Sequence, residues 1–175
     1  MPLNPYRLFD PDPQQKSIAF DLYQMVERMP IFSPHGHIDP SIFVKPDFQF
    51  GNPVEMFIQP DHYVLRMLYS QGISYQQIFD KENPQQGWRL FAENFYLYRG
   101  TPTGLWLTHS LAEVFGIDEK LTLSSADRIY TQIEQVLSTT EFTPRNLYKK
   151  FNIAVIATTD SAIDNLAHHQ AIASS

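Results

Sequence analysis

The stretch Ile31-Phe32-Ser33-Pro34-His35-Gly36-His37 begins as an apolar run and ends in two histidines that are one residue apart. This stretch predicts a short buried strand over 31–37 that enters a loop through Asp39-Pro40. In an extended strand, side chains at i and i+2 point to the same face, so His35 and His37 would project together as a pair of metal ligands. Gly36 lets neighbouring structure come close. Such pairs also arise by chance in loops and as ordinary core or surface histidines, so the spacing alone leaves both interpretations open.

The segment before this stretch predicts a helix over about 13–29. Asp12 can cap this helix, Pro13 suits its first position, and Pro30 ends it. Its apolar residues recur at helical spacing: Ile18, Leu22, Val26 and Met29.

A second strand is predicted near the other end of the chain. Ile153-Ala154-Val155-Ile156-Ala157 is an apolar run without polar alternation, as expected for a strand buried on both faces of a parallel sheet. Thr158 and Asp160 follow it and could face an active-site pocket, but capping of the next helix is the favoured interpretation. That helix would contain Ile163, Leu166 and Ile172.

The region 41–151 between the strands is dominated by helical patterns with identifiable start and stop residues. The predicted starts are Asn52-Pro53, Asp61, Pro102, Ser124 or Ser125, and Thr143-Pro144, and the predicted stops are Gly72, Gly100 and Gly116. One helix, marked by Trp88, Phe91, Phe95 and Tyr98, is expected to pack this region rather than to hold a cofactor. We therefore divide the chain into an N-terminal helix and first strand (1–40), a helical insertion (41–151), and a second strand with its helix (152–175).

Composition narrows the classes of function. The 175 residues are 43% hydrophobic and 14% aromatic, enough for a sizeable core. The net charge of −6 and the absence of a basic cluster beyond Lys149-Lys150 argue against nucleic acid binding. The chain contains no cysteine, so any metal site must use histidine and carboxylate ligands. With no signal-peptide pattern and no apolar window of about 20 residues, we expect a cytoplasmic protein without membrane contact.

Four blocks of the chain, taken in order, resemble uronate isomerase (glucuronate isomerase), a member of the amidohydrolase superfamily. The blocks are Pro30-Ile31-Phe32 leading to His35-Gly36-His37, Asp61-His62-Tyr63 with Arg66, Trp106–Gly116 with Thr108-His109, and Thr158-Thr159-Asp160 through Ile163-Asp164 to His168-His169. They are similar to the family's P-I-F-D-Y-H-C-H segment, its D-H-Y-x-x-R helix start, a third block, and its T-T-D-D-P-I-D…H-H stretch. Ser33-Pro34 and Ser161-Ala162 depart from the pattern without removing a residue assigned to catalysis.

The resemblance implies an α/β fold, namely the N-terminal part of a (β/α)8 barrel with an inserted helical region. The two predicted strands would be the first two barrel strands, and the chain as it stands would be mostly helical. Family members are far longer, and two strands do not make a stable parallel sheet. We therefore expect one incomplete domain.

The resemblance also implies an aldose–ketose isomerase that interconverts D-glucuronate and D-fructuronate. Its divalent metal, with zinc and manganese as leading candidates, would be held by His35 and His37 and by an aspartate from the last barrel strand. That aspartate is absent from this sequence. We therefore expect a weak or empty metal site and no activity from the 175 residues alone.

The second block implies the residues that contact substrate. Tyr63 would be the catalytic proton donor or acceptor, Arg66 offers a planar fork for the uronate carboxylate, and His62 would assist by hydrogen bonding. The sequence alone is also compatible with Tyr63 as a packing residue, Arg66 in a structural salt bridge and His62 as an exposed residue near a helix cap.

The remaining histidines predict no further ligands. His109 shares a helical pattern with Trp106, Ala112 and Phe115, which favours a buried and satisfied histidine. His168 and His169 diverge by about 100° on a helix, which favours a solvated face over chelation.

Two alternatives stay open at this point. One is a metal-dependent hydrolase of the amidohydrolase type, in which metal-bound hydroxide attacks an ester or amide. The other is a catalytically silent fragment or interaction module, whose unpaired strand edges would invite association. The expected partner is a small-molecule uronate, and a homo-oligomer is compatible with the sequence.

Overall fold

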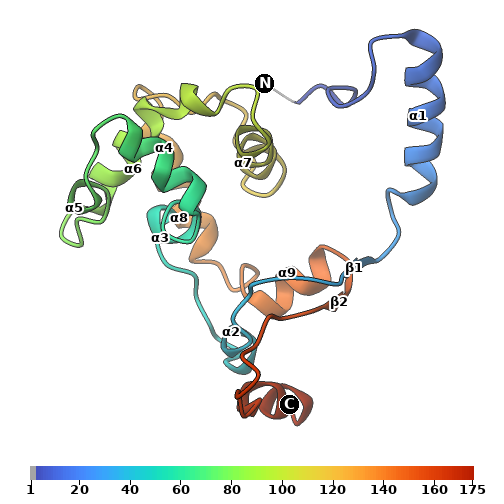
Figure 1. Ribbon diagram of the computed structural model, residues 1–175, viewed down its shortest axis with the longest axis vertical. Helices are drawn as coiled ribbons and strands as arrows, with labels where there is room; N and C mark the ends of the chain where they lie inside the picture. The colour runs from blue at the N-terminus through green and yellow to red at the C-terminus, as the bar shows by residue number, and fades with distance from the viewer. Residues whose placement is uncertain (1–2) are drawn as a thin grey trace. The chain divides into compact units, whose positions relative to one another are not determined.

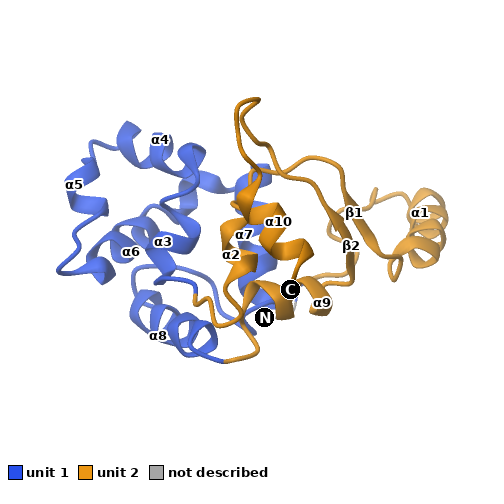
Figure 2. Ribbon diagram, turned by 90° about the horizontal axis from the view of Figure 1, so that it is seen from below, with its two compact units in different colours: residues 1–3, 50–139 blue, residues 4–49, 140–175 orange. Residues whose placement is uncertain are grey.

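The computed structural model describes residues 3–175, which form two compact units (Figure 2). Unit 1 consists mainly of Phe50–Thr139, and unit 2 consists of Asn4–Gln49 together with Thr140–Ser175. Unit 1 is helical, whereas unit 2 contains the sheet. Within residues 3–175, no helix has the length and apolar character that a membrane span requires.

Unit 2 is built around two short strands that lie side by side (Figure 1). Strand β1 (Ile31–Ser33) pairs in parallel with β2 (Ile153–Ile156), with Phe32 opposite Val155. The Ile31 N–H donates to the Asn152 carbonyl at 2.9 Å, and the Ala157 N–H donates to the Ser33 carbonyl at 2.9 Å. The predicted parallel pair is therefore confirmed. β1 ends four residues earlier than expected because Pro34 has no N–H to continue a ladder.

The predictions that the first strand is buried and that the second is buried on both faces are wrong for this chain. Val155 is 45% exposed, and its strand partner Phe32 is 67% exposed. A two-stranded sheet has two open edges and lacks the flanking strands that bury a parallel strand in larger sheets. The apolar run therefore predicted the strand correctly but not its surroundings.

Four helices complete unit 2: α1 (Pro13–Val26), α2 (Ser41–Val44), α9 (Pro144–Lys150) and α10 (Ala167–Ala173). The Asp12 side chain caps α1 by accepting the N–H groups of Gln14 and Gln15 at 3.0 and 2.9 Å, as predicted. The N-terminal segment packs on this helix through aromatic contacts of Tyr6 and Phe9 with Phe20. The remaining apolar row is exposed: Ile18, Leu22, Val26 and, beyond the helix, Met29.

The start of α10 corrects a second prediction. Asp160 does not cap a helix, because the chain runs irregularly through 161–166 before α10 begins at Ala167. The side chains of Asp164 and Asn165 accept the N–H groups of Leu166 and Ala167 at 2.7 and 2.9 Å. These local bonds favour turns over helix.

Unit 1 holds most of the buried apolar side chains. Its elements are α3 (Pro53–Phe57), α4 (His62–Ser70), α5 (Tyr75–Ile78), α6 (Pro84–Glu93), the 3-10 helix η1 (Phe95–Tyr98), α7 (Pro102–Glu113) and α8 (Ala126–Leu137). The indole N–H of Trp88 on α6 donates to the Ala126 carbonyl at the start of α8, at 3.0 Å. Ile129 and Ile133 of α8 are fully buried. Trp88, Phe91 and Tyr98 pack this core, as predicted.

The predicted helix boundaries in unit 1 are largely confirmed, with two differences. The helix marked by Trp88 and Tyr98 is interrupted at Asn94, whose side chain donates to the Leu90 carbonyl at 2.8 Å and so competes with the regular backbone pattern. The short helix α5 was not predicted, although Ser74 and Gln77 form a capping box at its start. Gly72, Gly100 and Gly116 follow helices with positive φ, as their predicted stop role requires.

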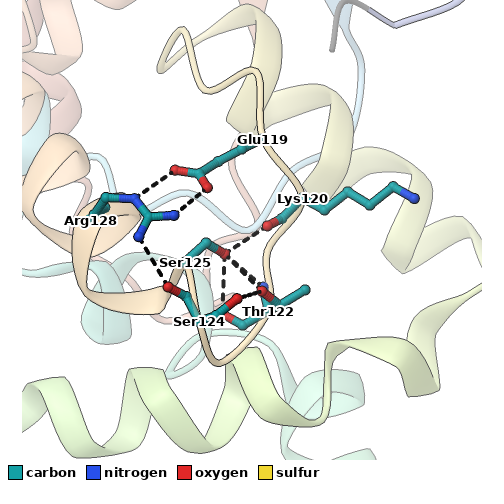
Figure 3. A network of polar contacts seen from close by, with 6 residues as sticks. All are labelled: Glu119, Lys120, Thr122, Ser124, Ser125 and Arg128. Carbon is teal, nitrogen blue, oxygen red and sulfur yellow. Dashed lines mark hydrogen bonds and ion pairs between the residues drawn. The ribbon is translucent and has the colours of Figure 1, made fainter.

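A polar network fixes the loop between α7 and α8 (Figure 3). Ser125 stands at the N-cap of α8, as predicted, but its side chain makes no cap bond. Its hydroxyl instead donates to the Lys120 carbonyl at 2.7 Å and accepts the Thr122 N–H at 2.9 Å. Arg128 on α8 pairs with Glu119 at 2.7 Å. The middle of the loop is thus held to the start of α8 by the Ser125 hydroxyl and by the Arg128–Glu119 pair.

Candidate active site

The two histidines of the opening stretch converge just beyond β1. The Nε2 atoms of His35 and His37 lie 3.2 Å apart, and the two rings are nearly perpendicular, with centroids 4.9 Å apart. Both side chains are exposed. One residue separates them, and they lie in the loop that follows β1, so their convergence fits the predicted same-face pair although the strand itself ends at Ser33.

This geometry fits a divalent metal ion. Two imidazole nitrogens bound at about 2.0–2.1 Å to one tetrahedral zinc ion lie about 3.3 Å apart, close to the observed 3.2 Å. Within residues 3–175, no group of three histidine, aspartate or glutamate side chains gathers to hold a metal. Asp39 carries the nearest carboxylate in sequence, but it accepts the Ser41 N–H at 2.8 Å. That bond is the main cause of the lowered pKa of Asp39.

Two hydrogen bonds hold the loop that carries the pair. The Ser33 hydroxyl donates to the His35 carbonyl at 3.2 Å, and the Thr159 hydroxyl donates to the Gly36 carbonyl at 2.8 Å. A Cβ atom on Gly36 would lie 2.9 Å from the Ala157 carbonyl oxygen, closer than real Cβ contacts. The prediction that Gly36 permits a close approach is therefore confirmed.

A second polar cluster follows β2. The Thr158 hydroxyl lies 2.5 Å from Asp160 Oδ2 and 2.9 Å from His169 Nε2, and this nitrogen is 3.6 Å from Asp160 Oδ2. The interpretation of Thr158 and Asp160 as helix caps is wrong, because they bind each other and α10. His169 is half-buried rather than solvated, and its Nδ1 is buried without a hydrogen-bond partner in the described chain. His168 is exposed, as expected.

The predicted substrate residues lie in unit 1, at the start of α4. The Asp61 side chain caps this helix by accepting the N–H groups of Tyr63 and Val64 at 2.8 and 3.2 Å, as predicted. Tyr63 is 59% exposed, so it does not pack in the core. His62 is also exposed, and its ring lies 4.2 Å from that of Tyr63 between centroids.

Arg66 is exposed on the same helix, three residues after Tyr63. Its side chain makes no salt bridge or hydrogen bond within residues 3–175, so the structural ion pair considered for it is not observed there. Residues three apart on a helix are neighbours on its surface, so Tyr63 and Arg66 can face one ligand.

Buried contacts fix the position of this helix start. Val64 and Leu68 are buried, and the Tyr98 hydroxyl donates to the Val64 carbonyl at 2.9 Å. Burial raises the pKa of Tyr98 above its ordinary value, and the charge of Asp61 adds to that rise. Tyr98 therefore stays protonated and able to donate at neutral pH.

His109 corrects another prediction. It is exposed on α7 rather than buried, because Leu107 and Leu111 form the buried face of that helix. Trp106, whose helical pattern suggested that His109 is buried, is itself 46% exposed.

Sequence reasoning missed the polar contacts of Thr159 and His169. In the sequence, Thr159 is only one of two adjacent threonines after a strand, and His169 is only one of two adjacent histidines on a helix. Neither pattern identifies a partner distant in sequence.

Comparisons with known proteins agree across the chain. The family model for glucuronate isomerase matches residues 14–175. The uronate isomerase of Nostoc punctiforme is 45% identical over 177 aligned residues, which cover 97% of this chain and 38% of the relative. That of Sphingopyxis alaskensis is 47% identical over 97% of this chain and 37% of the relative.

Solved structures give the same result. The crystal structure of glucuronate isomerase from Caulobacter crescentus matches with a TM-score of 0.94 and 42% identity, over 99% of this chain and 38% of that one. The uronate isomerase structure from Thermotoga maritima matches with a TM-score of 0.88 and 25% identity, over 99% and 37%. The chain thus spans a little more than a third of the length of these relatives.

Proposed function

Because this chain belongs to the glucuronate isomerase family, we propose that it forms part of a uronate isomerase that interconverts D-glucuronate and D-fructuronate. The observation that carries the proposal is the convergence of His35 and His37, whose Nε2 atoms lie 3.2 Å apart just beyond β1. The proposal includes a (β/α)8 barrel to which β1 and β2 contribute the first two strands, a divalent metal and a cytoplasmic location.

The reaction defines what the site must do. A proton leaves C2 of the aldose acid and hydrogen is delivered to C1, so the C1 aldehyde becomes an alcohol and the C2 alcohol becomes a ketone. This transfer needs a group that moves the proton, a donor at the carbonyl oxygen and stabilisation of the enediolate charge. The uronate carboxylate, at the other end of the sugar, offers a separate handle for binding.

His35 and His37 would hold the metal through their Nε2 atoms. A bound divalent ion, zinc or manganese, would supply Lewis-acid stabilisation of the charge that develops on the substrate oxygens. Two imidazoles are fewer than the three protein ligands of a typical catalytic zinc site, so we expect the 175 residues alone to bind metal weakly.

Tyr63 would exchange a proton with a substrate oxygen. Its side chain is exposed, and the Asp61 cap fixes its backbone at the first turn of α4. The His62 ring against that of Tyr63 restricts the tyrosine and can itself hydrogen-bond to substrate. Arg66, without a partner among the described residues and on the same side of the helix, would bind the uronate carboxylate.

A chimera tests the proposal. The chain replaces the matching part of the Caulobacter crescentus glucuronate isomerase, and D-glucuronate turnover is measured with Zn²⁺ or Mn²⁺ beside the 175-residue chain alone. We expect turnover from the chimera and little or none from the chain alone. A folded, metal-loaded chimera that does not isomerise D-glucuronate would contradict the proposal, and ester or amide hydrolysis by it would favour the hydrolase alternative.

Variants of the chimera separate the roles. We expect Tyr63→Phe to lower kcat by about a hundredfold or more, with little change in KM. Arg66→Lys should mainly raise KM, because lysine cannot form the bidentate contact with a carboxylate. Tyr69→Phe is the matched control, since Tyr69 is an exposed tyrosine on the same helix. Equal loss in Tyr69→Phe and Tyr63→Phe would exclude a specific role for Tyr63.

A further inference from the structure

The loop that carries the two histidines has one internal bond, from the Ser33 hydroxyl to the His35 carbonyl, which does not reach Gly36. Gly36 lies between His35 and His37, and glycine restricts its own backbone less than any other residue. The strand pairing does not extend this far, because the last ladder bond runs from the Ala157 N–H to the Ser33 carbonyl. The alternation that brings the imidazoles together is therefore not fixed by the strand.

Thr159 supplies a restraint at Gly36. Its hydroxyl donates to the Gly36 carbonyl at 2.8 Å, across a sequence separation of 123 residues. This bond fixes the peptide group that joins Gly36 to His37. It also continues the pairing of the two segments beyond the end of the β1–β2 ladder, at the end where both parallel strands exit.

The neighbours of Thr159 explain why it faces the loop. Thr158 and Asp160 bind each other at 2.5 Å, and the Thr158 hydroxyl lies 2.9 Å from His169 Nε2 on α10. Thr158 and Asp160 thus make contacts on the side of α10, whereas the Thr159 hydroxyl between them contacts Gly36. The branched side chain of threonine also restricts its χ1 angle, which limits the directions its hydroxyl can take.

We propose that Thr159 is a positioning residue that holds the His35–His37 pair in its converging geometry and thereby raises its affinity for a divalent metal. The effect on metal affinity rests on the proposed function. Thr159 touches neither metal nor substrate in this role, since it acts through the Gly36 carbonyl. The Thr158–Asp160–His169 cluster anchors the other side of the segment.

Two measurements on the 175-residue chain test the proposal. NMR of the metal-free chain detects the close approach of the two imidazoles as contacts between their ring protons. A Zn²⁺ titration gives the metal affinity, with His35→Ala identifying binding that depends on the pair. We expect Thr159→Val to weaken the ring contacts and to lower the Zn²⁺ affinity about tenfold, within the range known for groups that orient metal ligands.

Matched variants separate positioning from general destabilisation. Thr159→Ser keeps the hydroxyl and should stay within about threefold of the parent affinity, given that the range for lost orienting groups starts near tenfold. Thr131→Val removes an exposed helix hydroxyl from unit 1 and should change neither measurement. Circular dichroism checks that each variant keeps the parent's helical content.

The outcomes are distinct. Ring contacts and Zn²⁺ affinity unchanged in Thr159→Val would overturn the proposal, as would equal losses in the serine and valine variants. If the parent chain binds Zn²⁺ no better than His35→Ala, the affinity part of this inference fails, whereas the proposed function is decided by the chimera. In that case the metal-free ring contacts alone decide whether Thr159 positions the pair.

Discussion

The two units use similar apolar residues in opposite ways. In unit 1, the isoleucines of α8 are fully buried against other helices, whereas in unit 2 the apolar row of α1 and the strand residues Phe32 and Val155 are largely exposed. Both helices show apolar residues at helical spacing. Periodicity therefore predicts which face of an element is apolar but not whether anything covers that face. Unit 1 should therefore carry most of the stability of this chain.

The largest expected difference comes from one substitution made in each unit. Ile133→Ala removes a side chain that is 0% exposed, and should lower the free energy of unfolding by about 2–5 kcal/mol through lost burial and a cavity. Ile18→Ala, on an exposed helix face in unit 2, should change it by about 0.5 kcal/mol or less. Urea unfolding followed by circular dichroism measures both. Similar losses in the two variants would contradict the view that unit 1 carries most of the stability.

Each unit also contains a glycine whose missing Cβ faces a backbone carbonyl. A Cβ on Gly87 would lie 2.0 Å from the Ile78 oxygen, and one on Gly36 would lie 2.9 Å from the Ala157 oxygen. We expect Gly87→Ala to destabilise unit 1 by about 1–3 kcal/mol, as in other overpacked cores, and Gly36→Ala to have a smaller global effect. Thermal unfolding ranks the two variants, and amide shifts of Ala157 report the local change. A larger global effect from Gly36→Ala would contradict the ranking.

A buried hydroxyl gives an intermediate effect. Tyr98→Phe removes the hydrogen bond to the Val64 carbonyl and should cost about 1 kcal/mol. Tyr96→Phe is the matched control because Tyr96 is exposed in the same short helix. Chemical denaturation measures the difference between the two variants, and equal stability of both would show that the bond contributes nothing.

The smallest effect concerns an exposed ion pair of unit 1. The hydrogen bond from Arg89 holds the pKa of Asp127 below its usual value, so the pair contributes stability above the unfolded pKa near 4. That contribution is lost as pH falls through the folded pKa of Asp127. Asp127→Asn should therefore lower the urea midpoint slightly at pH 7 and not at pH 2, with Asp118→Asn as the control. A loss that persists at pH 2 would point to a cause other than charge.

The sequence predicts local chemistry well. Asp12, Asn52 and Asp61 cap the helices that follow them, because a cap depends on contacts within three residues. The i, i+2 spacing of His35 and His37 also predicted their convergence, but not the distant bond from Thr159 that holds their loop. Helix caps, in contrast, need no knowledge of the rest of the fold.

Contacts between distant segments account for what the sequence did not predict. The Thr159 bond to Gly36 and the exposure of Val155 depend on which strands lie beside β2. Asp160 looked like a helix cap because a carboxylate after a strand often is one, yet Thr158 and His169 bind it instead. A pattern of residue types does not specify which of several competing partners will be nearest.

The parallel pairing of β1 with β2 also bears on the order of folding. The bond between Thr159 and Gly36 spans 123 residues, and closing a flexible loop of that length has a large entropic cost before any contact forms. The contacts of unit 1 are more local, such as that of Trp88 with Ala126, 38 residues apart. Contacts of low sequence separation form faster. We therefore expect the helical unit to fold first and the histidine loop to acquire its geometry last.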